Sequence, residues 1–283
     1  MNEPMKLGYI GLGKMGAPMA KRLVDWPGGV TVFDLRSDAM TPLAELGATL
    51  ADGVADVAVA DVVSVTVLDD EQVRDVVGRL GTHATPGTVI AIHSTISPET
   101  AVQLADALRP SGIHVIDAPV SGGGAAAERG ELAIMVGADR EIYERVKPVF
   151  KRMGSMIVHA GEPGAGTRMK LARNMVSFIG YAAAGEAMEL AEASGIDLAQ
   201  LGRVVRHTDA LTGGAGAVMV RDTAAPLESD HWLYDTFVHT RGLGEKDLGL
   251  ALALGEAEGV TLPIAQVALQ NLAAGLGVPH PKE

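Results

Sequence analysis

Short apolar runs alternate with helical patterns along roughly the first 160 residues of the chain. The runs have the length of strands that are buried on both faces, and glycine, proline or serine follows most of them. We predict strands over residues 7–10, 30–33, 62–68, 89–92, 113–116, 133–136 and 156–159. We predict helices over residues 17–23, 73–80 and 99–108, the last with Pro98 in its first turn. This alternation predicts a parallel, doubly wound sheet whose ligand loops follow the carboxyl ends of the strands.

The longest predicted helix interrupts this alternation just past the middle of the chain. Pro163-Gly164 breaks the preceding segment, Thr167 is a suitable N-cap, and Ser194-Gly195 ends the helix. Apolar residues occupy nearly every face of this helix, so we expect it to be buried over much of its length.

Helical patterns alone follow the central helix. Helices are predicted over residues 197–207, 243–258 and 263–276, with a glycine-rich connection over 208–216, whereas 232–238 is ambiguous between strand and helix. The fold class is therefore α/β: an N-terminal doubly wound Rossmann-type parallel sheet, a long connecting helix and a C-terminal all-α domain. We place these parts at residues 1–163, 164–194 and 195–283.

Composition narrows the function classes. The 283 residues are 47% apolar but only 4% aromatic, with 35 glycines, which is typical of a well-packed globular α/β protein. A net charge of −12 argues against a broad nucleic-acid or anionic-membrane surface. The chain has no cysteine, and its eight histidines are scattered, so we expect no metal site. The N-terminus has no apolar signal segment and the central helix meets Glu186 too early to span a bilayer, so we expect a cytoplasmic protein.

A glycine-rich turn follows the first predicted strand at once. Gly11, Gly13 and Gly16 form a G-x-G-x-x-G motif between a strand and a helix. In a dinucleotide-binding fold, the first glycine permits the turn, the second admits the pyrophosphate and the third lets helix and strand pack closely. The second strand ends in Asp34, at the distance expected for the acid that binds the ribose, so we predict dinucleotide binding.

Asp34 also favours NAD over NADP. Its carboxylate accepts hydrogen bonds from a free 2′-hydroxyl and repels a 2′-phosphate. Arg36 weakens this preference because an arginine can accommodate the phosphate, although a solvated loop residue is the simpler interpretation of it.

Two further segments carry candidate chemistry. The loop over residues 117–124 contains Ser121 and three successive glycines, whose amides can bind a small anion such as a carboxylate; a flexible surface loop fits the spacing equally well.

Lys170 and Asn174 are four residues apart and therefore neighbours on one face of the central helix. A lysine in an apolar helix either reaches water or is held for a purpose.

With these motifs assembled, the chain resembles the β-hydroxyacid dehydrogenase family, which includes 3-hydroxyisobutyrate, tartronate semialdehyde and 6-phosphogluconate dehydrogenases. The resemblance runs from Leu7 to about Pro263. It rests on segments of matching order and spacing: the fingerprint over 8–20, Ser94-Thr95-Ile96 with Pro98, the loop from Asp117 to Gly123, Gly164 and Gly166 with Lys170 and Asn174, and the segment over 243–251.

The resemblance implies roles for individual residues. Lys170 would transfer the hydroxyl proton and Asn174 would hydrogen-bond the reacting oxygen. Ser121, Gly122 and Gly123 would hold the substrate carboxylate, and Lys246 would add positive charge near substrate or nicotinamide. The implied cofactor-binding residues are Gly11, Leu12, Gly13, Met15, Gly16, Asp34, Leu68, Thr95 and Lys246. Without the resemblance, an ordinary surface lysine at a helix start is the better interpretation of Lys170.

The chain departs from the family pattern at three places. Arg173 precedes Asn174 where the family often has a second asparagine. Asp69-Asp70 follows Leu68 where a Leu-Pro sequence is usual, and residues 221–240 match poorly. These differences concern the cofactor edge and the substrate pocket, so they leave the substrate open.

The implied activity is that of an NAD(P)-dependent 3-hydroxyacid dehydrogenase, an oxidoreductase that transfers a hydride between NAD and a small anionic 3-hydroxy acid such as 3-hydroxyisobutyrate, or its semialdehyde. The family implies a homodimer or homotetramer. The alternatives are a reductase of another small carbonyl or imine, and a non-catalytic dinucleotide-binding protein. A related imine reductase commonly lacks a lysine at position 170, and a binding protein would have no need for Lys170, Asn174 and Lys246 together.

Overall fold

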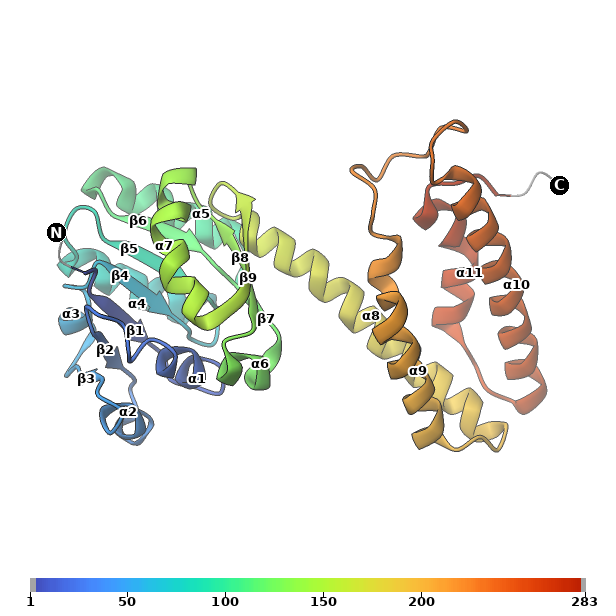
Figure 1. Cartoon of the computed structure of the whole chain (residues 1–283), viewed down its shortest axis with the longest axis horizontal. Coiled ribbons are helices and arrows are strands. Elements are labelled where there is room, and N and C mark those ends of the chain that lie inside the picture. Colours follow the sequence, from blue (N-terminus) through green and yellow to red (C-terminus); the bar gives the residue numbers. More distant parts are fainter. Residues whose placement is uncertain (1–3, 281–283) are drawn as a thin grey trace. The chain divides into compact units, whose positions relative to one another are not determined.

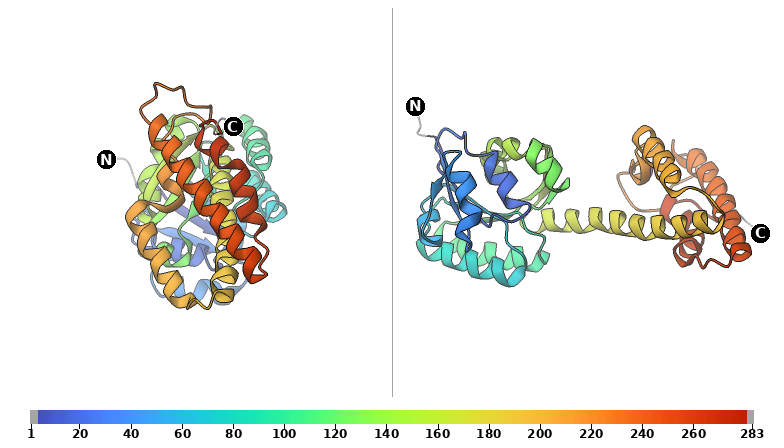
Figure 2. Two further views of the ribbon diagram at one scale, coloured as in Figure 1. Left: turned by 90° about the vertical axis from the view of Figure 1, so that its right-hand side faces the viewer. Right: turned by 90° about the horizontal axis from the view of Figure 1, so that it is seen from below.

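A computed structural model describes residues 4–280 of the chain. It contains two compact units, one ending at Arg173 and the other beginning at Asn174. The boundary between them falls inside helix α8 (Ala165–Ala193), which Figure 2 shows as one unbroken helix.

A single sheet forms the centre of the first unit. Its strands are β1 (Leu7–Ile10), β2 (Val30–Phe33), β3 (Thr49–Leu50), β4 (Val62–Val65), β5 (Val89–Ile92), β6 (His114–Asp117), β7 (Val120–Ser121), β8 (Leu132–Gly137) and β9 (Gly154–Gly161). Their order is β3-β2-β1-β4-β5-β6-β8-β7, with β9 also paired to β8 (Figure 1). Strand β1 pairs with β2 on one side and with β4 on the other, so the direction in which successive strands are added reverses at β1. This reversal places a topological switch point at the carboxyl end of β1, beside the glycine turn.

Helices cover both faces of the sheet, as the two views of Figure 2 show. One face packs against α1 (Gly16–Lys21), α2 (Ser37–Ala44), α6 (Gly123–Arg129) and α7 (Arg140–Met153). The other packs against α3 (Val54–Val57), α4 (Asp70–His83) and α5 (Pro98–Leu108), which a short 3-10 turn, η1 (Arg109–Ser111), follows. Strands β1, β4 and β5 are buried at every position, which explains why their sequences are apolar without alternation.

The structure confirms the predicted architecture and corrects parts of it. The sheet is parallel except where β8 meets β6 and β7, which are antiparallel to it. Only ten residues link β7 to β8, fewer than a parallel crossover needs. The predicted strand over 62–68 ends at Val65, because Val67 and Leu68 already belong to the loop before α4. Helix α7 was not predicted, although its buried residues recur at helical spacing.

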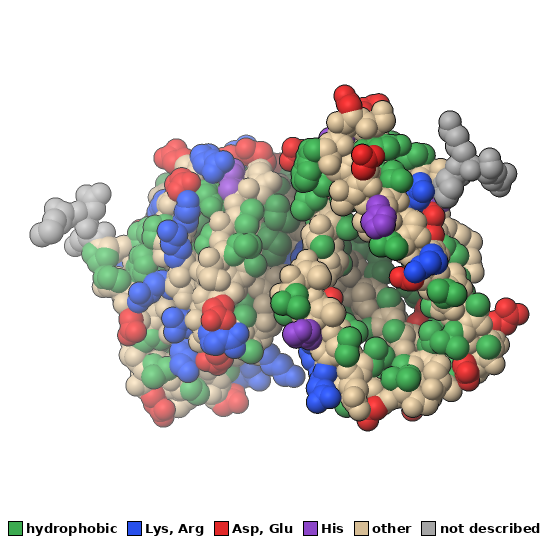
Figure 3. Space-filling model, turned by 45° about the vertical axis from the view of Figure 1, so that its right-hand side comes forward, with side chains coloured by type: hydrophobic (Ala, Val, Ile, Leu, Met, Phe, Trp, Pro, Cys, Tyr) green, Lys and Arg blue, Asp and Glu red, His purple; other side chains and the backbone are tan. Residues whose placement is uncertain are grey.

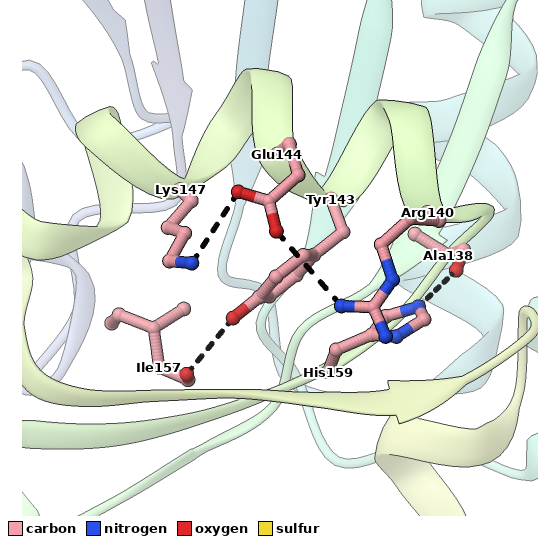
Figure 4. Close-up of polar contacts among 7 residues, drawn as sticks. All are labelled: Ala138, Arg140, Tyr143, Glu144, Lys147, Ile157 and His159. Carbon is pink, nitrogen blue, oxygen red and sulfur yellow. Dashed lines mark hydrogen bonds and ion pairs between the residues drawn. The ribbon is translucent and has the colours of Figure 1, made fainter.

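Helix α7 and strand β9 are joined by a polar cluster on the outside of the first unit (Figure 4). The Tyr143 hydroxyl donates to the carbonyl of Ile157 at 3.1 Å, and His159 Nε2 lies 2.7 Å from the carbonyl of Ala138. The guanidinium carbon of Arg140 and the Nζ of Lys147 lie over the Tyr143 ring, 5.6 and 5.1 Å from its centroid. These contacts fix β9, the strand that leads directly into α8.

In the described part of the second unit, the regular elements are all helices. It contains the remainder of α8, α9 (Leu198–Thr212), the 3-10 turn η2 (Gly214–Val218), α10 (Tyr234–Glu258) and α11 (Pro263–Leu276). The ambiguous segment 232–238 is therefore mainly the start of α10, and residues 208–212 of the predicted connection extend α9. Glu186 ties α8 to α11, because its carboxylate accepts hydrogen bonds from the backbone amides of Ile264 and Ala265 at 2.5 and 3.0 Å.

The expected burial of the central helix is wrong. Within α8 only Gly166, Thr167 and Lys170 are buried, whereas Met175 and Phe178 are about 60% exposed. Helices α9 to α11 leave this apolar face uncovered in the single chain. The predicted cap is also wrong: α8 begins at Ala165, so Thr167 lies inside its first turn. Between residues 4 and 280, no helix has the length and hydropathy needed to cross a membrane.

Candidate active site

The glycine turn after β1 has three glycines with three different surroundings. Gly11 has φ +91°, and a Cβ there would lie 2.2 Å from the carbonyl oxygen of Thr66. A Cβ on Gly16 would lie 1.9 Å from the carbonyl oxygen of Gly11, whereas a Cβ on Gly13 would meet nothing within 4 Å. The outer glycines are therefore required by the turn and the packing, while Gly13 leaves open space on the side where a pyrophosphate approaches.

Asp34 closes this turn from the end of β2. One carboxylate oxygen accepts a hydrogen bond from the amide of Leu12 at 2.7 Å, and the other accepts one from the amide of Arg36 at 2.9 Å. The Arg36 guanidinium lies 3.5 Å from the same carboxylate but is mostly exposed. Asp34 is thus held beside the glycine turn, as a ribose-binding acid must be. Met15, from the same turn, is half-buried against the core on that face.

The loops after β4 and β5 are joined by a serine. Ser94 Oγ accepts a hydrogen bond from the amide of Val67 at 2.9 Å and donates one to its carbonyl at 2.6 Å. Leu68 and Thr95, the candidate cofactor residues that follow, are both exposed at this edge.

The acidic pair that replaces Leu-Pro has a structural use. Asp69 caps α4 by accepting a hydrogen bond from the amide of Gln72 at 2.9 Å. Asp70 accepts hydrogen bonds from the Ser97 amide and the Thr100 hydroxyl, so it joins the starts of α4 and α5. Asp69 and Asp70 therefore stabilise the starts of the two helices that follow β4 and β5.

The buried side chain of His93 links the carboxyl ends of neighbouring strands of the sheet. Its Nδ1 lies 2.8 Å from the carbonyl of Ala118 and its Nε2 lies 3.0 Å from Ser64 Oγ, so it spans β4, β5 and the residue after β6. Complete burial lowers the pKa of His93 to about 4, and the hydrogen bond to Ala118 only partly offsets this. The ring is therefore neutral near pH 7 and acts as a fixed hydrogen-bonding strut.

The predicted carboxylate loop begins at β7. Ser121 is buried, and Gly122 and Gly123 follow it with φ +133° and +72°. These values lie in the region that favours glycine, and a Cβ on Gly122 would also lie 2.7 Å from the Ala126 methyl group. The loop is thus a turn that leads into α6, with Gly122 and Gly123 exposed at the surface.

Lys170 is brought to this loop from α8. Its Nζ donates hydrogen bonds to the carbonyl of Val120 at 2.6 Å and to Ser121 Oγ at 2.9 Å, and the residue is only 8% exposed. Burial lowers the pKa of Lys170, and the positive charge of Arg173 one turn later lowers it further. A lysine that loses its proton more readily and lies against a serine has the properties of a proton-transfer group.

Asn174 and Lys246 belong to the second unit. Asn174 follows Lys170 by one turn of α8 and is half-buried. Lys246 lies on α10, where its Nζ is 3.0 Å from a carboxylate oxygen of Asp247 and its side chain is 61% exposed. The structure therefore brings Lys170 to Ser121 and Asp34 to the glycine turn. The roles of these residues and of Asn174 and Lys246 stay predictions.

Sequence reasoning assigned no role to His93 or Asp117. Both are buried polar residues placed directly after an apolar strand, His93 after β5 and Asp117 at the end of β6. A polar residue at the carboxyl end of such a strand was the available signal. Within residues 4–280, no cluster of three or more metal-ligating side chains is present.

Two family models together match almost the whole chain. The family model described as the NAD binding domain of 6-phosphogluconate dehydrogenase matches residues 6–161. The model described as NAD-binding of NADP-dependent 3-hydroxyisobutyrate dehydrogenase matches residues 164–278.

Individual proteins are similar over almost the whole chain. An uncharacterized oxidoreductase of Mycobacterium tuberculosis is 64% identical over 99% of this chain and 96% of its own length. The NAD-dependent L-serine dehydrogenase of Pseudomonas aeruginosa is 36% identical over 93% of this chain and 90% of its own length. A crystal structure from Mycobacterium avium superimposes with a TM-score of 0.95 and 71% identity, covering 98% of this chain and 100% of that one. The chain therefore belongs to the β-hydroxyacid dehydrogenase family of NAD(P)-dependent oxidoreductases.

Proposed function

We propose that this protein oxidises a small 3-hydroxy acid with NAD, or reduces the corresponding semialdehyde. The observation that carries the proposal is the contact between the buried Lys170 and Ser121. It places a group able to take a proton beside the glycine loop assigned to the substrate carboxylate. The L-serine dehydrogenase relative supports this substrate class, because L-serine is itself a 3-hydroxy acid.

The residues divide the chemistry between them. In the oxidative direction, the neutral amine of Lys170 accepts the hydroxyl proton, and in the reductive direction its ammonium returns that proton. Asn174 hydrogen-bonds the reacting oxygen from the next turn of the helix. Ser121 and the amides of Gly122 and Gly123 hold the carboxylate, and Lys246 adds positive charge near substrate or nicotinamide.

NAD, when bound, supplies the hydride acceptor. The glycine turn with Leu12 and Met15 would hold its pyrophosphate, Asp34 its adenine ribose, and Leu68 and Thr95 the nicotinamide side. Asp34 supports NAD over NADP, since the Leu12 and Arg36 amides already fix its carboxylate where a 2′-phosphate would be repelled.

A substrate panel tests the proposal. We expect NADH formation from at least one of 3-hydroxyisobutyrate, L-serine, glycerate, 4-hydroxybutyrate and threonine, followed at 340 nm. Silence across the panel together with tight NADH binding would favour a dinucleotide-binding protein. Turnover of cyclic imines alone would instead favour an imine reductase. A higher kcat/KM with NADP than with NAD would contradict the cofactor preference.

We also propose that the chain forms a homodimer or homotetramer through its second unit. Exposed apolar side chains recur along the part of α8 that belongs to this unit, at spacings of three or seven residues: Met175, Phe178, Tyr181 and Met188. Figure 3 shows further hydrophobic side chains exposed on the helices of this unit. An apolar stripe of this kind is typical of a subunit interface. Light scattering should give a multiple of 29.3 kDa, and Phe178→Glu should shift the mass toward one chain; a wild-type monomer would contradict the proposal.

A further inference from the structure

Asp117 is a buried acid that none of these roles uses. It ends β6, and its side chain is fully buried. One carboxylate oxygen accepts a hydrogen bond from the amide of Gly164 at 2.6 Å, and the other accepts one from the amide of Thr167 at 2.6 Å. Both amides belong to the start of α8, the helix that carries Lys170.

The first amides of a helix have no partner within the helix and are usually satisfied by a neighbouring side chain. In α8 the acceptor is instead supplied by a strand residue that precedes the helix by 47 and 50 positions. A carboxylate that accepts two short hydrogen bonds at the positive end of a helix interacts strongly with it. Burial raises the pKa of Asp117, and the amides of Gly164 and Thr167 oppose that rise by stabilising the charged form.

Two glycines let the helix start lie directly on the sheet. A Cβ on Gly166 would lie 2.2 Å from the carbonyl oxygen of Met135 and 3.0 Å from that of Asp117. A Cβ on Gly137, which pairs with Asp117 across the antiparallel contact, would lie 2.2 Å from its carboxylate. The first turn of α8 therefore has little freedom to slide relative to β6 and β8.

The same attachment sets the position of the lysine. Lys170 follows Gly166 by one helical turn, and its partners Val120 and Ser121 follow Asp117 by three and four residues. Asp117 thus links the start of α8, which carries Lys170, to the chain segment that carries Val120 and Ser121. We propose that Asp117 is a positioning residue whose carboxylate holds the first turn of α8 and thereby places Lys170 Nζ against Ser121. The functional side of this inference rests on the proposed role of Lys170.

Arg173, on α8 itself, is the charged group that lowers the pKa of Lys170. Asp117 ends β6, and Arg168 lies in the first turn of α8. Strands β7 and β8 present only uncharged residues. Release of Lys170 from its place would therefore expose its ammonium to water, and its pKa would rise toward the ordinary lysine value because burial is the main cause of its lowering.

Asp117→Asn tests the inference with little change of shape. One amide of α8 would then face an NH₂ group instead of an acceptor. We expect kcat to fall about 10- to 100-fold through misplacement of Lys170, while NAD affinity changes less than about twofold. The pH midpoint for acetylation of Lys170, measured by mass spectrometry on the free protein, should rise.

A second variant and a control separate positioning from stability. Gly137→Ala keeps the Asp117 charge but displaces its carboxylate, so it should lower kcat and raise the acetylation midpoint in the same way, even if Asp117→Asn folds poorly. Val77→Ala shortens a fully buried side chain of α4 and should lower the melting temperature without either effect.

The outcomes are distinguishable. Lower melting temperatures with unchanged kcat per folded molecule and an unchanged acetylation midpoint would overturn the positioning role. A raised midpoint in both variants, with no dehydrogenase turnover by the wild-type protein, would uphold the positioning of Lys170 and reject the proposed function.

Discussion

Lys170→Met abolishes most turnover while leaving NAD binding intact: this is the largest effect we expect. Methionine keeps much of the side-chain volume but cannot exchange a proton, so kcat should fall by about 10²- to 10⁴-fold. NADH fluorescence titration should give a dissociation constant near that of the wild type, because the glycine turn and Asp34 do not contact Lys170. Retained turnover would reject Lys170 as the proton-transfer group.

Lys151→Met is the matched control, since Lys151 is an exposed lysine of α7 in the same unit and should be dispensable. The pH dependence of the wild-type enzyme adds a second check. Because burial and the charge of Arg173 lower the pKa of Lys170 below that of an ordinary lysine, the neutral amine becomes available at lower pH. The kcat/KM for oxidation should therefore rise with pH and reach its plateau below the pH at which an ordinary lysine titrates.

Gly13→Ala and Gly16→Ala should both lose NAD, but for different reasons. Nothing lies within 4 Å of a Cβ on Gly13, so this variant should fold normally and lose affinity because the methyl group occupies the pyrophosphate side. We expect a loss of about tenfold or more, equivalent to about 1.4 kcal/mol. On Gly16 the methyl group would overlap the Gly11 carbonyl, so this variant should lose affinity and also about 1–3 kcal/mol of stability.

Isothermal titration with NAD and thermal unfolding distinguish the two effects. Gly78→Ala serves as the control, because it lies on an exposed position of α4 with open space around it. It should leave NAD affinity unchanged and should not lower stability, since alanine is favoured over glycine inside a helix. Unchanged NAD affinity in Gly13→Ala would mean that the turn serves packing alone.

The sequence predicts those parts of the fold whose signals are local. Strand β5 was predicted to the residue because Val-Ile-Ala-Ile is buried at every position and is bounded by polar loops. Helix α11 was predicted to the residue because Pro263 at its start and Gly277 after its end mark both boundaries. The glycine turn and Asp34 were predicted for the same reason, since strand, turn and acid lie within about 30 residues.

Other features depend on contacts that no local pattern contains. The apolar pattern of α8 is the same whether its residues pack inside one chain or against another chain. The prediction that they are buried within the chain was therefore wrong. The partners of Asp117 are 47 and 50 residues away, and nothing near it in the sequence marks it as a helix anchor. The effect of Arg173 on the pKa of Lys170 likewise depends on α8, because the helix places the two residues one turn apart.

The distance between Asp117 and its partners also orders the assembly of the first unit during synthesis. Strand β6 leaves the ribosome long before Gly164 and Thr167, so the carboxylate stays hydrated until the start of α8 arrives. Burying it earlier would leave an uncompensated charge in the interior. Asp117 therefore gains its two hydrogen-bond donors only when the start of α8 docks, and the same docking brings Lys170 to Val120 and Ser121. A nascent chain that stops short of Thr167 lacks one of the two amides that bind Asp117, and it lacks Lys170 as well.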